Sequence, residues 1–109
     1  MYRSTFTGPP IIEPTVTVFH INESDSVTFS CNAVASPPIH LETWSKDGVN
    51  LYLYSGPIIS NYTITNARIE DSGIYRCRVT NSKGSTIKAF ILTVNEGNFL
   101  TLARLVSST

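Results

Sequence analysis

Two stretches of the chain alternate between apolar and polar residues, which is the pattern of a β-strand with one buried face. In Val27–Cys31 and again in Tyr75–Val79, the odd-numbered positions are apolar and the even-numbered positions are Thr, Ser or Arg. Each stretch carries one of the two cysteines on its apolar face, and Trp44 lies between the two stretches. The pattern predicts two strands with inward cysteines, and a tryptophan strand between them, in two sheets that pack face to face.

Further apolar runs, separated by turn residues, predict the remaining strands. Pro14 interrupts the first run, and because proline cannot donate a ladder hydrogen bond, this run belongs at a sheet edge. Turns are expected at Asn22–Asp25, Lys46–Gly48 and Asn81–Gly84. The expected strands cover residues 11–21, 26–35, 39–46, 51–54, 61–65 and 85–95.

The strand around Trp44 does not follow the pattern. Counting back by twos from Trp44 puts Glu42 and His40 on the inner face. The same count leaves Leu41 and Ile39 outside. Because an uncompensated buried carboxylate is costly, we expect a β-bulge near Glu42 that resets the register. The alternative is that this end of the strand lies open to solvent.

The order and spacing of Cys31, Trp44, Tyr75 and Cys77 resemble the framework of the immunoglobulin fold. The stretch between Trp44 and Cys77 is too short for the two extra strands of a variable domain. The resemblance therefore implies an all-β, two-sheet antiparallel immunoglobulin-like sandwich with Greek-key connections, similar to the intermediate set (I-set, C2-like). The turn Asn81–Gly84 and the ending Leu92–Val94 are also typical of that set.

The resemblance assigns a role to each framework residue. It implies that Cys31 and Cys77 form a structural disulfide, rather than a redox switch, with Trp44 packed against it. The Tyr75 hydroxyl would reach the backbone a few residues upstream, in a tyrosine corner. Asp71 would pair with a basic residue of a neighbouring strand, but residues 48–66 contain no Lys or Arg. Immunoglobulin modules also often break their first strand, so that it switches from one sheet to the other.

Length and composition set the limits of function. The 109 residues, with no net charge, form one domain without a general attraction to nucleic acid or anionic membranes. No apolar run approaches the roughly 20 residues of a membrane span. We expect a lead-in over residues 1–9, the domain over residues 10–95, and a tail or linker over residues 96–109 with apolar residues at helical spacing. His20 and His40 are isolated, so we expect no catalysis, metal or cofactor.

Two triplets match the acceptor sequence for N-glycosylation. They are Asn22-Glu23-Ser24 and Asn61-Tyr62-Thr63, one at a predicted turn and one on a predicted outward strand position. Such triplets also arise by chance, so chance and glycan acceptor remain equal alternatives for Asn22 and Asn61.

The final predicted strand is apolar at nearly every position, whereas a strand with one wet face should alternate. If its even-numbered residues from Phe90 to Val94 are inside, an exposed apolar row remains outside. This row and two neighbouring arginines predict a contact face, which consists of Arg76, Arg78, Ile87, Ala89 and Ile91. Alternatively the tail covers the row, or its residues are present for strand propensity.

The framework is most typical of a recognition module in the ectodomain of a cell-surface receptor or adhesion protein. Residues 73–94 are similar to ligand-binding modules of receptor tyrosine kinases, and residues 65–73 resemble Fc-receptor modules. We expect an extracellular, non-enzymatic domain whose partner is a protein ligand or a second copy in a homodimer. The alternatives are an intracellular structural module of the muscle-filament type and a secreted immune effector.

Overall fold

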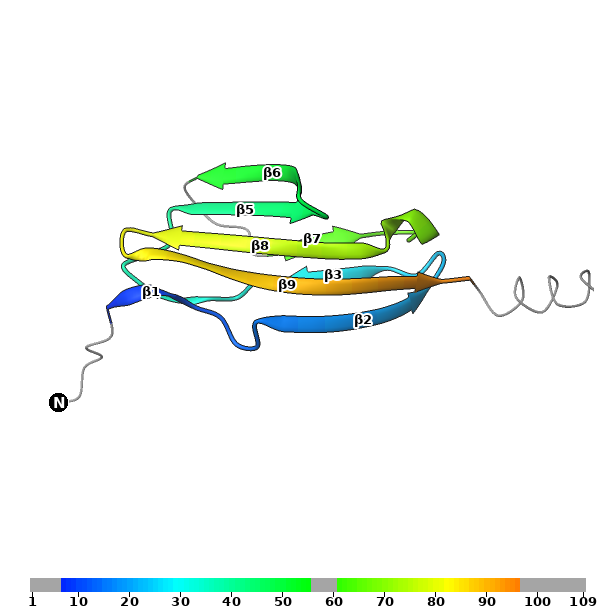
Figure 1. Ribbon diagram of the computed structural model, residues 1–109, viewed down its shortest axis with the longest axis horizontal. Coiled ribbons are helices and arrows are strands. Elements are labelled where there is room, and N and C mark those ends of the chain that lie inside the picture. The colour runs from blue at the N-terminus through cyan, green and yellow to red at the C-terminus, as the bar shows by residue number, and fades with distance from the viewer. Residues whose placement is uncertain (1–6, 56–60, 97–109) are drawn as a thin grey trace, which may run out of the picture.

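The computed structural model describes residues 7–55 and 61–96, with the side chains of all of these except residues 52–55 (Figure 1). This part of the chain forms strands and one short 3-10 helix, η1 (Ile69–Asp71). The predicted helical spacing of the tail lies outside the described residues. The strands are β1 (Gly8–Ile11), β2 (Val16–Asn22), β3 (Val27–Ser30), β4 (Val34–Ser36), β5 (Leu41–Lys46), β6 (Val49–Ser55), β7 (Asn61–Ile64), β8 (Gly73–Asn81) and β9 (Gly84–Asn95).

The strands form two layers, so the predicted all-β sandwich is confirmed. One layer is a five-stranded sheet in the order β2-β9-β8-β5-β6, and β1-β4 and β3-β7 form the opposing layer. Figure 1 shows β3 and β7 behind β8 and β9. All described pairings are antiparallel except that of β2 with β9, which is parallel.

The parallel pairing arises where the chain changes layers. β1 pairs with β4 in one layer, and β2 pairs with β9 in the other. The break between the two strands contains Pro14, which follows a cis peptide bond after Glu13, and the buried Ile12. The interruption that Pro14 predicts is therefore the point at which the first strand moves from one sheet to the other.

The core between the layers contains a cluster of aromatic rings and one disulfide. Cys31 and Cys77 are bonded across the layers, with their Cα atoms 6.4 Å apart. The ring of Phe90 lies 5.6 Å from that of Trp44 and 4.9 Å from that of Phe29, measured between centroids. Each fully buried side chain of this size contributes roughly 1.5–3 kcal/mol through the hydrophobic effect.

The register of β5 corrects one prediction. β5 pairs regularly with β8 from Leu41 to Lys46, and its irregularity lies on the β6 side, between Trp44 and Ser45. Glu42 therefore stays on the inner face with no exposed surface. Both the bulge near Glu42 and the solvent-open end are wrong, because Trp44 Nε1 donates a hydrogen bond to Glu42 Oε2 and compensates part of the burial. Before β5 the order that counting back by twos gives for His40 and Ile39 is reversed: His40 is exposed, and Ile39 packs against the core.

Candidate interaction face

The outer face of the five-stranded sheet carries an exposed apolar row on β9. The even-numbered residues Phe90, Leu92 and Val94 are buried between the layers. On the opposite side, Ile87 and Ile91 are exposed by 48% and 36%, while Ala89 is half-buried. The side chains of β9 therefore alternate strictly, although the strand is apolar on both faces.

The cross-strand register widens this row into a patch. Ala89 lies between Val16 of β2 and Arg76 of β8. Ile91 lies between Val18 of β2 and Ile74 of β8. Val16 and Val18 are exposed by 50% and 53%, so the apolar surface extends to the sheet edge. We call the set Val16, Val18, Ile74, Arg76, Arg78, Ile87, Ala89 and Ile91 the outer patch.

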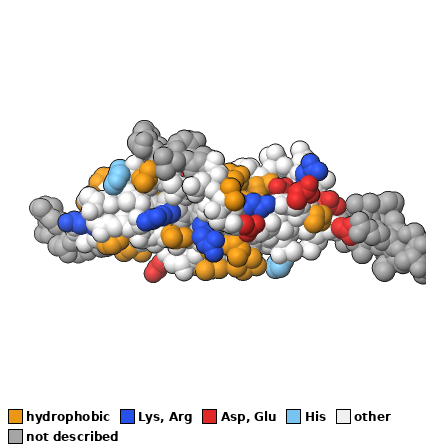
Figure 2. Space-filling model, turned by 45° about the horizontal axis from the view of Figure 1, so that its top comes forward, with side chains coloured by type: hydrophobic (Ala, Val, Ile, Leu, Met, Phe, Trp, Pro, Cys, Tyr) orange, Lys and Arg blue, Asp and Glu red, His pale blue; other side chains and the backbone are white. Residues whose placement is uncertain are grey.

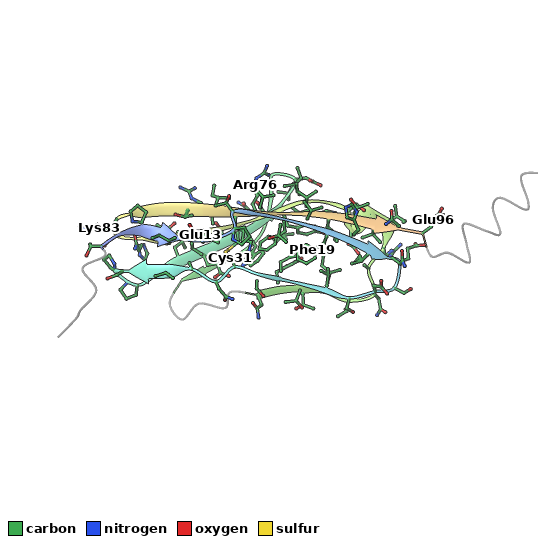
Figure 3. The ribbon with its side chains drawn as sticks, turned by 90° about the horizontal axis from the view of Figure 1, so that it is seen from below. Glu13, Phe19, Cys31, Arg76, Lys83 and Glu96 are labelled. Atoms are coloured by element: carbon green, nitrogen blue, oxygen red, sulfur yellow. A yellow bond between two sulfur atoms is a disulfide. The ribbon has the colours of Figure 1, made fainter. Side chains whose placement is uncertain are left out.

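Arg76 and Arg78 supply the charge of the outer patch. They lie beside Ala89 and Ile87 in the register, and both side chains are exposed. Within residues 7–55 and 61–96, neither guanidinium takes part in a salt bridge. Figure 3 shows Arg76 on the outer side of the sheet, whereas Phe19 and Cys31 lie between the layers. In Figure 2, basic side chains lie among hydrophobic ones on the visible face.

The sequence reasoning did not find the contribution of β2 to this patch. Val16 and Val18 join it because β2 runs parallel to β9, and no local pattern specifies that pairing. Both faces of β2 carry apolar residues. Phe19 and Ile21 pack against the core, whereas Val16 and Val18 are exposed on the other face. The one available signal was the alternation of Val16 and Val18 with Thr17 and Phe19.

The framework residues Tyr75 and Asp71 fix the turn that leads into β8. The Tyr75 hydroxyl donates to the Asp71 carbonyl oxygen at 2.5 Å, which is the contact of a tyrosine corner. The Asp71 carboxylate accepts from the backbone N–H of Arg68 at 2.8 Å and so closes η1. Burial, with the nearby Asp71 charge, raises the pKa of the Tyr75 hydroxyl far above its usual range, so it remains a donor at physiological pH.

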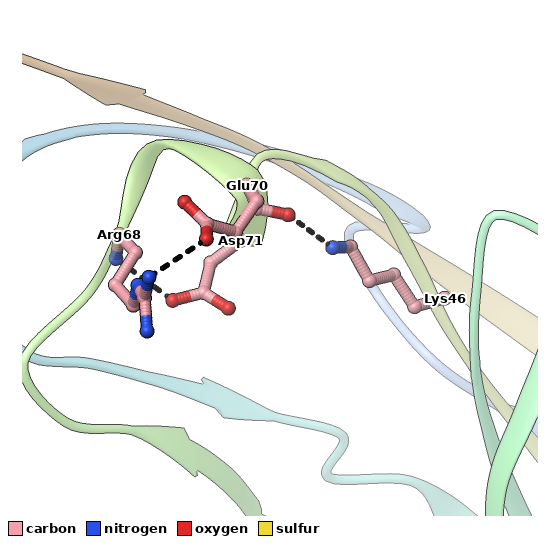
Figure 4. A network of polar contacts seen from close by, with 4 residues as sticks. All are labelled: Lys46, Arg68, Glu70 and Asp71. Atoms are coloured by element: carbon pink, nitrogen blue, oxygen red, sulfur yellow. Dashed lines mark hydrogen bonds and ion pairs between the residues drawn. The ribbon is translucent and has the colours of Figure 1, made fainter.

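Asp71 has a different neighbourhood from the one that the resemblance implies. Arg68, which belongs to the same turn, forms its ion pair with Glu70 at 3.1 Å (Figure 4). Lys46 comes from β5, but its ammonium group donates to the Glu70 carbonyl oxygen. In the described part of the chain, the Asp71 carboxylate therefore accepts a hydrogen bond within its own turn and forms no ion pair.

Both candidate glycan acceptors are exposed. Asn22 ends β2, and its backbone N–H donates to Asp25 Oδ2 at 3.1 Å. Asn61 begins β7, opposite Ser30 of β3. Their occupancy stays a prediction.

Two buried polar residues were missed from the sequence. The Asn81 side chain is 3% exposed and donates to the carbonyl oxygens of Gly8 and Pro37, both at 2.8 Å, while its Oδ1 accepts from Lys83 N–H. The Lys88 side chain points inward, with its Nζ 5.1 Å from the centre of the Phe90 ring. The alternation of β9 places Lys88 on the same inward face as Phe90. The burial of Lys88 was overlooked because the strand was treated as apolar at nearly every position.

Among the described residues, no three His, Cys, Asp or Glu side chains are grouped so that they could bind a metal ion. In the same residues, no helix has the length and apolar character needed to cross a membrane.

The chain belongs to the immunoglobulin superfamily. Residues 9–81 match the immunoglobulin domain family. The chain is 39% identical over 106 residues to the mouse cell adhesion molecule DSCAML1. The matched region covers 92% of this chain and 5% of that protein. It is 36% identical over 80 residues to mouse vascular endothelial growth factor receptor 1, covering 70% of this chain and 6% of the receptor.

Solved structures show the same fold. Titin domain M4 superposes with a TM-score of 0.69 and 25% identity, covering 84% of this chain and all of that domain. In contrast, the chain spans only a small part of the length of DSCAML1 and of vascular endothelial growth factor receptor 1. Domains of this kind occur both in receptors and adhesion proteins and in titin, and such proteins are typically receptors or structural proteins rather than enzymes.

Proposed function

We propose that the chain is a non-catalytic recognition module from the extracellular part of a cell-surface receptor or adhesion protein. It binds a protein partner through the outer patch. The observation that supports this most directly is the continuous apolar surface from Ile87 to Val18, bordered by Arg76 and Arg78. Apolar cores bordered by arginine are typical of protein interfaces, where a carboxylate of the partner can form a bidentate pair.

A charge at the centre of the outer patch tests this proposal. The Ile91→Lys variant of the chain, displayed as a fluorescent multimer, should bind cultured cells about tenfold less than the wild type, because a lysine ammonium would be desolvated on contact. Val34→Lys is the matched control, since Val34 is 67% exposed on β4 in the opposite layer. Binding should disappear when the cells are treated with trypsin, as expected for a protein partner.

The result that overturns the proposal is equally specific. If a folded Ile91→Lys chain stains cells as strongly as the wild type does, the outer patch is not the binding surface. If staining survives trypsin, the partner is not a protein. Far-ultraviolet circular dichroism and a cooperative melt confirm that each variant is folded.

The alternative function is an intracellular structural module, and the similarity to titin domain M4 favours it. The two exposed acceptor triplets favour the extracellular proposal instead.

Secretion from eukaryotic cells should give a product whose mass falls on N-glycosidase treatment, and Asn22→Gln and Asn61→Gln should each remove one step of that fall. Each substitution should change the free energy of unfolding by less than about 0.5 kcal/mol. A secreted product with unchanged mass would contradict the prediction.

A further inference from the structure

β2 is an edge strand whose free side can be assigned residue by residue. In the described part of the chain it pairs only with β9. Ala89 N–H donates to the Thr15 carbonyl at 2.9 Å, and Glu23 N–H donates to the Asn95 carbonyl at 2.8 Å. These two bonds show that the odd-numbered residues direct their backbone groups toward β9. The N–H and C=O groups of Val16, Val18 and His20 therefore point away from the sheet.

This edge lacks the features that usually prevent strand addition. Proteins protect edge strands with lysine, proline, bulges or inward charges. β2 reads Val-Thr-Val-Phe-His-Ile-Asn, which includes none of these residues, and its register with β9 is continuous. Val16 and Val18 add two exposed apolar side chains at the edge itself.

We propose that β2 pairs antiparallel with β2 of a second copy of the chain, about a two-fold axis through Val18. This pairing rests on the proposed recognition role: the partner is a second copy of the chain, and the contact is made through the edge of β2. In this register Val18 lies opposite Val18 of the second copy, and Val16 lies opposite its His20. All three free residues then exchange backbone hydrogen bonds, because in an antiparallel ladder alternate pairs do so. The inward side chains of both copies remain in their own cores.

A second copy suits this edge for two reasons. The register is self-complementary, so one strand supplies every donor and acceptor that the other needs. The chain carries no net charge, and β2 has no Asp, Glu, Lys or Arg, so two copies do not repel each other along the paired segment. The pairing also joins the outer patches of both copies through Val18 and Ile91, which are register partners.

The contact should be weak and concentration-dependent. Three paired residues and a few valines bury less than the roughly 1,200 Å² of a stable interface. The paired segment itself carries no Asp, Glu, Lys or Arg, so the association should change little with added salt. A contact between arginines and carboxylates on the outer patch would instead weaken with salt.

Sedimentation of the unglycosylated chain at increasing concentration tests the pairing. Val18→Pro removes the outward N–H without breaking a bond to β9, so it should fold. It should raise the dimer dissociation constant roughly ten- to a hundredfold. Val18→Thr keeps the N–H and the β-branched shape, and Ile87→Lys changes the outer patch beyond the end of β2; both should still dimerise. Hydrogen exchange of the wild type should show concentration-dependent protection at Val16, Val18 and His20, and this readout does not depend on any variant.

Each outcome decides one point. Loss of the dimer in Val18→Pro, but not in the two controls, supports edge pairing. Loss in Ile87→Lys with retention in Val18→Pro overturns it and leaves a contact through the outer patch. A wild type that stays monomeric, with no protection of these amides, also overturns it. The proposed recognition role fails separately, when cell binding is indifferent to Ile91→Lys.

Discussion

Glu42 places a carboxyl group in the core of the molecule, beside the indole of Trp44. Its Oε2 accepts the Trp44 hydrogen bond, but Oε1 has no partner among the described residues. Burial raises the pKa of the Glu42 carboxyl above its ordinary value of 4.5, and the Trp44 hydrogen bond opposes part of that rise. The side chain is therefore most compatible with the fold when it is protonated.

The pH dependence of stability should report this residue. Because the pKa of Glu42 is higher in the folded than in the unfolded protein, the folded state holds the proton more tightly. Its contribution to stability is full below the unfolded-state pKa and is lost as the pH rises through the folded-state pKa. Glu42→Gln lacks this loss, so its stability relative to the wild type should increase with pH. Urea denaturation over a pH series measures the difference, and parallel profiles would contradict the prediction.

Asn81 is a second buried polar residue, and all of its side-chain contacts are satisfied. Its amide donates to two carbonyl oxygens, at Gly8 and Pro37, and so ties the β8–β9 turn to β1 and to the chain before β5. Asn81→Ala should cost about 1–3 kcal/mol, because it leaves buried carbonyls without donors. Asn81→Asp should cost more above the pKa of the new carboxyl, since it puts an acceptor against two acceptors. Denaturant midpoints at acid and neutral pH test this; equal losses for Asp and Ala at neutral pH would refute the second expectation.

At the scale of elements, the turn from η1 into β8 is shaped by a glycine. Gly73 has φ +156°, and a Cβ there would lie 2.6 Å from Asp47 Oδ2. The Asp47 carboxylate is held in place, because its Oδ1 accepts from Ile74 N–H at 2.9 Å. The glycine in Asp71-Ser72-Gly73 is thus required by the β5–β6 turn that packs against it.

Gly73→Ala should therefore destabilise the domain by about 1–3 kcal/mol. Part of that loss comes from displacing Asp47, so the same substitution in an Asp47→Ala background should cost less. A double-mutant cycle measured by denaturation isolates this coupling. Gly48→Ala is the control, since Gly48 also has a positive φ of +86° but has no atom near its Cβ. If the cycle shows no coupling, the Asp47 contact does not explain the glycine.

The elements also show what the sequence could and could not predict. Alternation in Tyr75–Val79 and the final strand specified side-chain parity, because one buried face is a local property. The parallel pairing of β2 depends on where the break at Pro14 leads the chain, which is not local. Hydropathy predicts that Glu42 avoids the core, but Glu42 is buried. Its partner Trp44 lies two residues away on the same strand face and donates a hydrogen bond to it. Only the full packing shows that this hydrogen bond forms.

At the scale of the whole molecule, two layers are joined by one covalent bond. Phe29, Trp44, Tyr75 and Phe90 belong to the same core cluster as the two bonded cysteines, and all four are buried. The aromatic cluster would remain if the bond were reduced, since both cysteines have no exposed surface and pack as small apolar residues. The disulfide and the core therefore contribute separately to stability, and the two contributions can be measured apart.

Reduction of the Cys31–Cys77 bond should lower the free energy of unfolding by about 4 kcal/mol. The bond spans 46 residues of sequence, and in the chain-entropy model a closed loop of that size restricts the unfolded state by roughly this amount. Single domains are stable by about 5–15 kcal/mol, so the reduced chain should still fold at moderate temperature. Guanidinium denaturation, with the protein first unfolded in reductant and then refolded, compares the two forms. The Cys31→Ala/Cys77→Ala chain should unfold at the same midpoint with and without reductant. A wild type whose midpoint is equally indifferent to reductant would show that the bond does not form in solution.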